Sequence, residues 1–267
     1  MKIQRYKHDS LCSYALGMTL TMELLLKKPE AARTVYISPE IEKNRNYDAM
    51  DALCRDKHIP IVTSEKAFNI LSPKGNCFVI GVFEKFEERL SDGNHVVLVE
   101  PSDAGNLGTI IRTATGFGLK DLAIIRMSAV SGTETGLTDQ NAPAGKTGEA
   151  NRRTAVDIFD PKVVRASMGA IFRIRFAYFD TFEDYQTAYP ARHGYPFMLQ
   201  KTSRSIHDVT FEEPFSLIFG NEATGLPDSF AELPGLQPVI IPHSNEIDSL
   251  NLSMAAGIGM YEATKKT

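Results

Sequence analysis

The sequence predicts an α/β protein whose main part is a parallel sheet covered by helices on both faces. Strand-like and helix-like segments alternate along most of the chain, which is typical of such sheets. The run His95–Glu100 is almost continuously apolar, as expected of a strand buried on both faces. The 267-residue chain is 43% hydrophobic, which is enough to bury a sizeable core.

The first segment, residues 1–90, is predicted to be a small α/β domain. Leu16, Leu20 and Leu24 recur at a spacing of four before Pro29, which predicts a helix over Ser13–Lys27. The other expected elements are strands at Thr34–Ser38, Ile59–Thr63 and Cys77–Phe83, and helices at Tyr47–Lys57 and Ser64–Leu71. The charged stretch Glu84–Asp92 predicts a linker to a second domain, residues 95–267.

The second domain is predicted to continue the alternation after His95–Glu100. We expect helices at Asn106–Phe117, Pro161–Met168, Phe182–Ala188 and Ser249–Lys265, and strands at Leu122–Arg126, Arg173–Tyr178, Phe197–Gln200, Phe215–Phe219 and Val239–Ile241. The stretch Ser128–Ala155, rich in Gly, Thr, Ala and Asn, interrupts this pattern. A loop of this length is either functional or disordered, and the sequence favours neither.

Composition narrows the classes of function. The formal net charge of −4 argues mildly against a protein that coats nucleic acid nonspecifically. No apolar run is long enough to cross a bilayer, and Met1–Ser10 does not resemble a secretory leader. The three cysteines are widely spaced without a CxxC pair, so we expect no disulfide framework and no metal site. A reducing cytoplasm fits this pattern.

The segment Pro101–Gly118 joins a buried strand to a helix, which is where open parallel sheets usually bind ligands. Apolar and small residues at spacings of four, three and four, ending at Gly118, predict the buried stripe of this helix. Arg112 lies on another face with Gly108 and Gly116. A phosphate approaching Arg112 explains these glycines, and tight helix packing beside a surface arginine explains them equally well. The segment is not a GxGxxG or GxxxxGK[ST] motif.

Two later segments also follow predicted strands. In Phe215–Pro227, glycines flank Glu222, whose possible roles are to orient Arg112, to bind a cationic ligand or to cap the next helix. In Val239–Gly257, Asp248 or Ser249 is the expected N-cap of the closing helix, with Asn251 in its first turn. His243 is expected to be a polar loop residue rather than a base, because the sequence offers it no partner.

Taken together, the three segments resemble the signature motifs of the SpoU (TrmH) family of RNA ribose methyltransferases, within the SPOUT superfamily. The matching patterns are NxGxxxRxAxxFG at Asn106–Gly118, FGNExxG at Phe219–Gly225 and IP…SLNxSxA at Ile241–Ala255, in the family's order and spacing. The resemblance runs from about Val96 to the C-terminus. The stretch His243–Glu246 departs from the family's usual Met- and Gly-containing sequence.

This resemblance implies a sheet whose C-terminal part forms a trefoil knot that binds S-adenosylmethionine. By position, Gly220, Ile241 and Leu250 would line the cofactor pocket. The implied reaction is methyl transfer to a ribose 2′-hydroxyl of RNA by a homodimer, with Arg112 of one subunit completing the site of the other. Arg112 is expected to grip a phosphate and stabilise the developing alkoxide rather than act as a base, because guanidinium resists deprotonation. The residues that match family positions orienting the arginine and the substrate are Asn106, Glu222, Ser249 and Asn251.

The first segment, through about Phe83, resembles the small α/β RNA-binding domain fused to many ribosomal RNA members of the family. Ser13–Thr19 together with Glu23–Leu25 carries this weaker likeness. It favours ribosomal RNA as the substrate. The alternatives are a transfer RNA methyltransferase, a resistance-type ribosomal RNA methylase and a catalytically silent RNA-binding relative.

Overall fold

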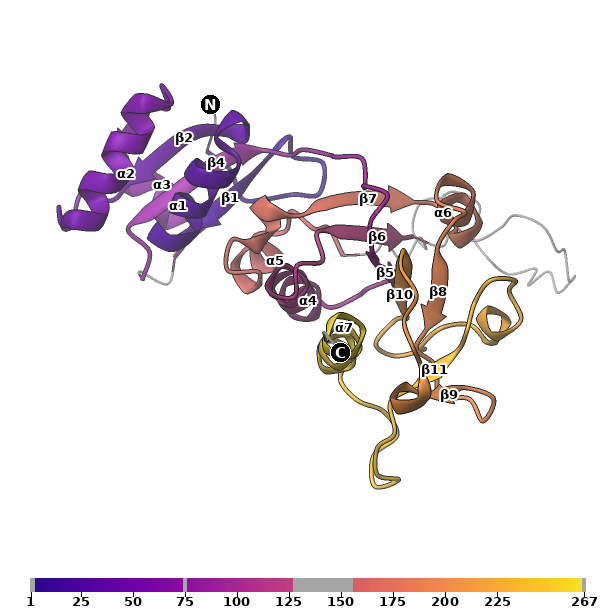
Figure 1. Cartoon of the computed structure of the whole chain (residues 1–267). Coiled ribbons are helices and arrows are strands. Elements are labelled where there is room, and N and C mark those ends of the chain that lie inside the picture. Colours follow the sequence, from indigo (N-terminus) through magenta and orange to yellow (C-terminus); the bar gives the residue numbers. More distant parts are fainter. Residues whose placement is uncertain (1–2, 74–75, 127–155, 266–267) are drawn as a thin grey trace, which may run out of the picture.

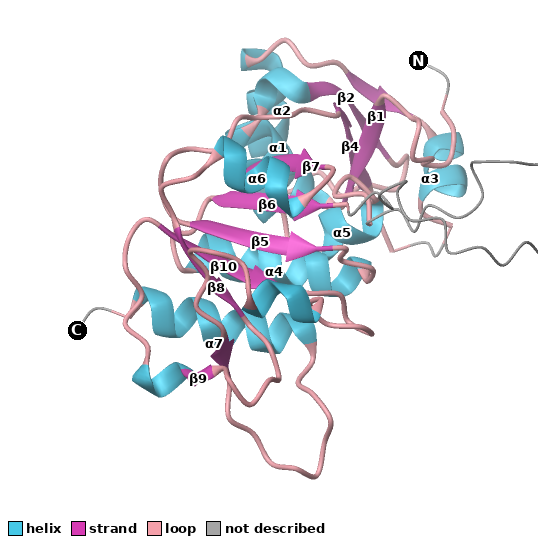
Figure 2. Ribbon diagram, turned by 90° about the vertical axis from the view of Figure 1, so that its right-hand side faces the viewer, coloured by secondary structure: helices cyan, strands magenta, loops and turns pink. Residues whose placement is uncertain are grey.

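A computed structural model describes residues 3–73, 76–126 and 156–265, and two sheets organise them (Figures 1 and 2). The predicted loop Ser128–Ala155 lies outside these residues. No helix in the described part of the chain is long and apolar enough to span a membrane. The chain passes from the first sheet to the second between Glu84 and His95, inside the predicted linker region.

The first sheet has four strands in the order β1-β4-β2-β3, with three helices packed on it. β1 and β2 both run antiparallel to β4, and β3 runs parallel to β2. α1 and α2 cover one face, and α3 covers the other with Phe68 against Tyr36 and Ile80. The elements are β1 Cys12–Leu16, α1 Met18–Lys27, η1 Pro29–Ala31, β2 Ala32–Ile37, α2 Arg45–Asp56, β3 Ile61–Thr63, α3 Glu65–Leu71 and β4 Val79–Glu84.

The second sheet has five strands, all parallel, in the order β7-β6-β5-β10-β8. Figure 2 shows strands of this sheet side by side with their arrowheads toward one edge. A short parallel pair, β9 and β11, lies beyond the edge strand β8. The elements are β5 His95–Val99, α4 Ala104–Gly116, β6 Asp121–Ile125, α5 Pro161–Ala166, η2 Ala170–Arg173, β7 Arg175–Phe179, α6 Phe182–Ala188, β8 His193–Pro196, β9 Arg204–Ser205, η3 Ile206–Asp208, β10 Phe215–Phe219, η4 Asp228–Ala231, β11 Val239–Ile240 and α7 Leu252–Thr264.

Successive residues of the central strand face opposite sides of this sheet. Val96 and Leu98 pack with α4, α5 and α7, while Val97 and Val99 pack with α6 and η4. All five residues of β5 are buried. The predicted parallel sheet with helices on both faces is therefore confirmed.

The two sheets share a continuous hydrophobic core. The rings of Phe83 on β4 and Phe172 on η2 meet edge to face with centroids 5.0 Å apart. The buried Ser13 hydroxyl donates to the carbonyl of Phe159, and Arg173 forms a two-pronged ion pair with Glu23 of α1. Whether residues 1–90 and 95–267 fold as independent domains stays a prediction.

Two predicted elements are wrong in extent. Ser13–Leu16 is a strand rather than the start of a helix, because these residues pair with β4, and Gly17, at φ 110°, turns the chain into α1. The predicted strand Phe197–Gln200 is displaced, since the chain pairs with β10 over His193–Pro196. Gly194 and Pro196 hid this strand from the sequence pattern, although proline is tolerated on an edge strand.

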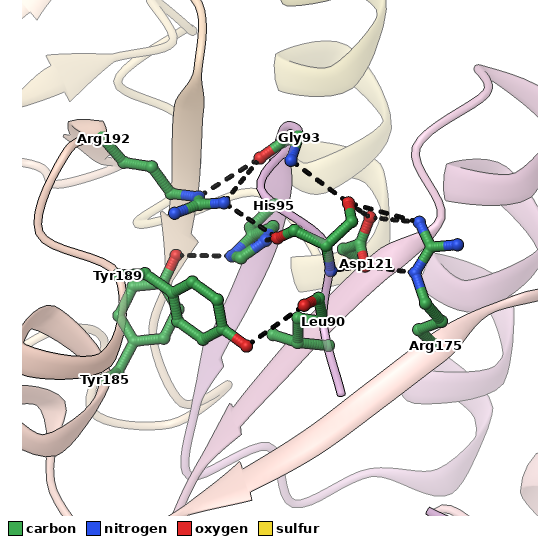
Figure 3. Close-up of polar contacts among 9 residues, drawn as sticks. Leu90, Gly93, His95, Asp121, Arg175, Tyr185, Tyr189 and Arg192 are labelled. Atoms are coloured by element: carbon green, nitrogen blue, oxygen red, sulfur yellow. Dashed lines mark hydrogen bonds and ion pairs between the residues drawn. The ribbon is translucent and has the colours of Figure 1, made fainter. Parts of the chain in front are cut away.

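The amino ends of the parallel strands hold a buried polar network (Figure 3). His95 bonds through Nε2 to the carbonyl of Ser91 at 2.8 Å, and its Nδ1 lies 2.9 Å from the hydroxyl of Tyr185. A carbonyl only accepts, so Nε2 carries the proton and Nδ1 accepts from Tyr185. Asp121 accepts two bonds each from Ser91 and Arg175. This network ties the starts of the strands together.

Candidate active site at the carboxyl edge of the sheet

A cavity of about 370 Å³ opens where the central strands end. It is lined by residues from four separate stretches of chain: 197–200, 219–228, 239–243 and 249–255. Open parallel sheets usually bind ligands at this edge, and ligand pockets commonly measure roughly 300–1,000 Å³. The cavity therefore has the position and size of a small-molecule site.

Residues 220–226 form a tight backbone loop along one wall of the cavity. Asn221 and Gly225 exchange backbone hydrogen bonds, and Gly225 has a positive φ of 67°. A Cβ on Gly220 would lie 2.2 Å from the carbonyl carbon of Gly225, so only glycine fits there. The Asn221 side chain accepts from the Ala223 amide and donates to the carbonyl of Glu100 at the end of β5. The loop is thus held in one conformation against the central strand.

Two stacked rings form an apolar wall of the same cavity. Phe197 and Phe219 have centroids 4.5 Å apart and planes 18° from parallel. Gly259 of α7 makes room for them, because a Cβ there would lie 2.7 Å from the Phe197 ring. This wall suits a flat or apolar part of a ligand.

The three residues expected to line a cofactor pocket all line this cavity. Gly220 is buried, and Ile241 and Leu250 are partly buried. Ser249 and Glu222 line it as well. The second and third of the three predicted segments therefore meet at one cavity.

Glu222 holds the start of α4. Its carboxylate accepts from the amide and hydroxyl of Ser102, from the amide of Asp103 and from Nδ2 of Asn106. Burial raises the pKa of Glu222, but these hydrogen bonds outweigh it and hold that pKa below its usual value. The carboxylate is therefore a fixed anion beside the positive end of α4. It does not cap the helix that follows it, so that predicted role is wrong. Within one chain it does not contact Arg112, and its role in orienting that arginine stays a prediction.

Asn251 links the third segment to the first. Its Nδ2 donates to Oδ1 of Asn106 at 3.1 Å, and its Oδ1 accepts from the amides of Ser253 and Met254. Asn251 is thus the N-cap of α7, and the prediction of Asp248 or Ser249 in that position is wrong. The helix starts later than expected because the side-chain oxygen of Asn251 accepts from the first free N–H groups of the helix. The bond to Asn106 fixes the orientation of this side chain.

Arg112 stands apart from the cavity. Its side chain is exposed on α4, about 9 Å of helix rise beyond Asn106. Within residues 3–73, 76–126 and 156–265 it forms no hydrogen bond or ion pair, and it does not line the cavity. Gly108, four residues before Arg112, allows α4 to pack closely against α5, since a Cβ on Gly108 would lie 2.4 Å from Cβ of Ala166. Gly118 is exposed beyond the end of α4, so its predicted place in the buried stripe is wrong.

His243 lies closer to the ligand space than the sequence indicated. It is partly buried, lines the cavity, and its Nδ1 is 2.9 Å from the carbonyl of Ile241. Ser102, Asn221 and the Phe197–Phe219 pair were not predicted from the sequence to be functional residues. The asparagine after a buried strand, in a glycine-bounded turn, is the one signal that could have marked Asn221. Among the described residues, no group of three or more His, Cys, Asp or Glu side chains could hold a metal ion.

A parallel α/β sheet with a cavity at its carboxyl edge is the arrangement in which open α/β proteins usually bind ligands. Residues 150–261 match the model of the SpoU rRNA Methylase family. The chain is 28% identical over 177 residues to a 23S rRNA (uridine(2479)-2′-O)-methyltransferase from Streptomyces viridochromogenes, covering 64% of this chain and 52% of that protein. It thus spans about half the length of that relative.

Two further comparisons agree with the family. The chain is 27% identical over 177 residues to a putative tRNA (cytidine(34)-2′-O)-methyltransferase from Listeria innocua, covering 65% of this chain and 88% of that protein. A crystal structure of an AdoMet-bound rRNA methyltransferase from Sinorhizobium meliloti superposes with a TM-score of 0.70 and 24% identity, covering 94% of this chain and 86% of that one. The fold is therefore shared over nearly the whole chain.

Proposed function

We propose that this protein transfers a methyl group from S-adenosylmethionine to a ribose 2′-hydroxyl of RNA. The observation that carries the proposal is the meeting of the second and third family segments at one cavity, with Gly220, Ile241 and Leu250 on its walls. The first segment is joined to both through the hydrogen bonds of Asn106 with Glu222 and Asn251. Both relatives named above are called RNA 2′-O-methyltransferases. The family match supports the same reaction.

The cavity fits S-adenosylmethionine in size and chemistry. Its aromatic wall suits an adenine ring, and the backbone of residues 220–226 offers polar groups beside it. The charged side chains among its lining residues are the carboxylates Glu222 and Asp228, which favour a ligand with positive charge. When bound, this cofactor supplies a methyl group already activated by the sulfonium.

The polar network would position the substrate side of the reaction. Glu222 and Asn251 fix Asn106 from two directions, and Glu222 also fixes the loop before α4. Ser249, on the cavity wall, is proposed to contact the substrate or the cofactor. Arg112 is proposed to bind the RNA phosphate and stabilise the developing alkoxide.

We propose a homodimer in which Arg112 of one subunit completes the site of the other. The exposure of Arg112 and its absence from the cavity of its own chain support this arrangement. Exposed Phe117, Met254 and Tyr261 on α4 and α7 offer apolar contact area nearby. Sedimentation that gives a monomer at micromolar concentration would overturn this arrangement.

We also propose that the C-terminal segment forms a trefoil knot. After β11 the chain returns past the cavity, and α7 packs against α4 while Gly259 sits under the two stacked rings. Such a path through residues 197–226 is what the resemblance implies.

The first sheet is proposed to bind RNA. The cytoplasm, where RNA is modified, is the proposed location of the protein.

Ribosomal RNA is the proposed substrate class. The Streptomyces relative is named for 23S rRNA, and the structure named as an rRNA methyltransferase matches 94% of this chain. Transfer RNA is the second candidate, because the Listeria relative named for it matches over 88% of its own length.

The test uses the whole purified protein, S-adenosylmethionine with a labelled methyl group, and separated ribosomal and transfer RNA from cells lacking the gene. We expect label in 2′-O-methylated nucleosides of ribosomal RNA. Label in transfer RNA alone would establish the second candidate. Cofactor binding measured by calorimetry without transfer to either RNA would identify a silent RNA-binding relative.

A further inference from the structure

Methyl transfer to a hydroxyl requires an acceptor for its proton, and Arg112 and Glu222, two residues predicted to act in the reaction, are poor acceptors. Arg112 keeps its proton and does not line the cavity of its own chain. Glu222 has its oxygens occupied by Ser102, Asp103 and Asn106, and the same bonds hold its pKa low. A carboxylate held in this way is a weak base.

His243 differs from these groups in its hydrogen bonding. The oxygen that its Nδ1 meets is a backbone carbonyl, which only accepts, so Nδ1 carries a hydrogen. In the neutral imidazole, Nε2 then has a lone pair with which it can accept a hydrogen bond or a proton. No hydrogen bond to Nε2 occurs among the described residues. The backbone thus fixes both the tautomer and the ring of a residue on the cavity wall.

We propose that His243 is the general base of this reaction. The proposal rests on the methyl transfer proposed above. The ribose 2′-oxygen forms a bond to the methyl carbon, the carbon–sulfur bond breaks and its electron pair stays on sulfur. The hydroxyl proton passes to Nε2 of His243, which later releases it to water.

The charges around His243 suit this role. Glu222 and Asp228 line the same cavity, and Asp228 is fixed by a bond from Nε2 of Gln200 at 2.6 Å. Glu246 and Asp248 follow His243 in the same loop. No lysine or arginine of the same chain is among the cavity's described lining residues.

This role lies where the chain departs from the family pattern. The sequence did not predict a partner for His243. Its partner is the backbone carbonyl of Ile241, and every residue type has such a carbonyl. The proposed proton acceptor is therefore a residue that the family pattern does not contain.

The test compares His243→Gln and His243→Ala with wild type on the RNA fraction that wild type methylates. The matched control is His193→Gln, an exposed histidine at the opposite end of the edge strand β8. We expect kcat to fall about 100-fold in both His243 variants and to stay unchanged in the control. Added imidazole should restore part of the activity of His243→Ala but none to His243→Gln, whose side chain still fills the site.

Two readouts do not depend on turnover. Calorimetry should give cofactor affinities within about three-fold of wild type for both His243 variants. Nitrogen-15 NMR of the wild-type protein should show His243 in the Nδ1–H form.

The outcomes separate this inference from the proposed function. If wild type transfers no methyl group to any RNA, the proposed function is wrong and the inference falls with it. If wild type is active and both His243 variants retain kcat within three-fold, His243 is not the base. An Nε2–H tautomer in the NMR spectrum would overturn the inference as well.

Discussion

At the amino edge of the five-stranded sheet, polar side chains are buried and paired with one another, whereas at the carboxyl edge they are paired but more exposed to solvent. His95, Asp121 and Ser216 are at most 4% exposed, and each has hydrogen-bond partners within the protein. Asn106 and Glu222 are only partly buried, and Asn251 is exposed. The same kinds of residue thus stabilise the fold at one edge and are proposed to bind ligands at the other.

This difference follows from the energetic cost of burying a polar group that has no hydrogen-bond partner. A buried polar group without a partner costs about 1–3 kcal/mol, so the amino edge satisfies every group it buries in the network of Figure 3. At the carboxyl edge, loops leave the sheet and can leave groups free for a ligand. Variants at the two edges should therefore lose different properties.

The largest expected effect is on catalysis. Arg112→Ala should lower methyl transfer about 1000-fold or more, because it removes the charge proposed to stabilise the transition state. Cofactor affinity measured by calorimetry should stay within about two-fold, since Arg112 does not line the cavity of its own chain. Arg89→Ala, at an exposed arginine of the linker, is the control. Activity of Arg112→Ala within a few-fold of wild type would refute the assigned role.

The amino edge should show the opposite behaviour. Asp121→Asn removes a buried carboxylate that holds Arg175 and Ser91, and should lower the free energy of unfolding by about 3 kcal/mol. Cofactor affinity of the folded fraction should not change. Urea unfolding measures the first and calorimetry the second, with the exposed Asp56→Asn as a control whose unfolding midpoint stays at that of wild type. Equal stability of Asp121→Asn and wild type would contradict the structural role.

His95 should make the amino edge sensitive to acid. Burial lowers its pKa from the ordinary 6.5 to about 4, so the unfolded chain binds more protons between these values. Its contribution to stability is complete above the unfolded pKa and is lost as pH falls toward the folded one. Urea unfolding should show a loss of about 2 kcal/mol between about pH 7.5 and pH 5, and His95→Gln should lack this part. NMR titration showing wild-type His95 protonated near pH 6.5 would contradict it.

The smallest effect separates two functions of one residue. Asn251→Ala loses the cap of α7 and should cost about 1 kcal/mol of stability. Asn251→Asp keeps the capping oxygen but cannot donate to Asn106, so its thermal midpoint should stay near wild type while methyl transfer falls. If both variants keep full activity, the link between Asn251 and Asn106 has no part in the reaction.

Much of the fold followed from local pattern. The strands β5 and β10 and the helix α6 match the predicted runs, because each is long, apolar or periodic, and bounded by clear stop signals. The β1 strand was missed because Leu16 continues the spacing of Leu20 and Leu24, although pairing with β4 claims it. The strand β8 was misplaced because its glycine and proline are unfavourable in any strand but an edge one.

The sequence predicted which residues belong to the site but not which atoms they contact. The order and spacing of three motifs selected Gly220, Glu222, Ile241, Ser249 and Leu250, which line one cavity. Their partners could not be found in this way. Orienting Arg112 was one of three roles predicted for Glu222, and no pattern predicted that it binds the start of α4, where the loop from β10 meets the loop from β5 in space.

By itself the sequence determined the fold class, the parallel sheet and the residues that gather at its carboxyl edge, because these depend on local periodicity and on motif spacing. Only the tertiary structure decided which atoms meet. It showed that Asn251 caps α7 and donates to Asn106, and that His243 is fixed by a backbone carbonyl. Hydrogen bonds to the backbone and contacts between distant loops depend on distances in space, and a linear sequence records none of them.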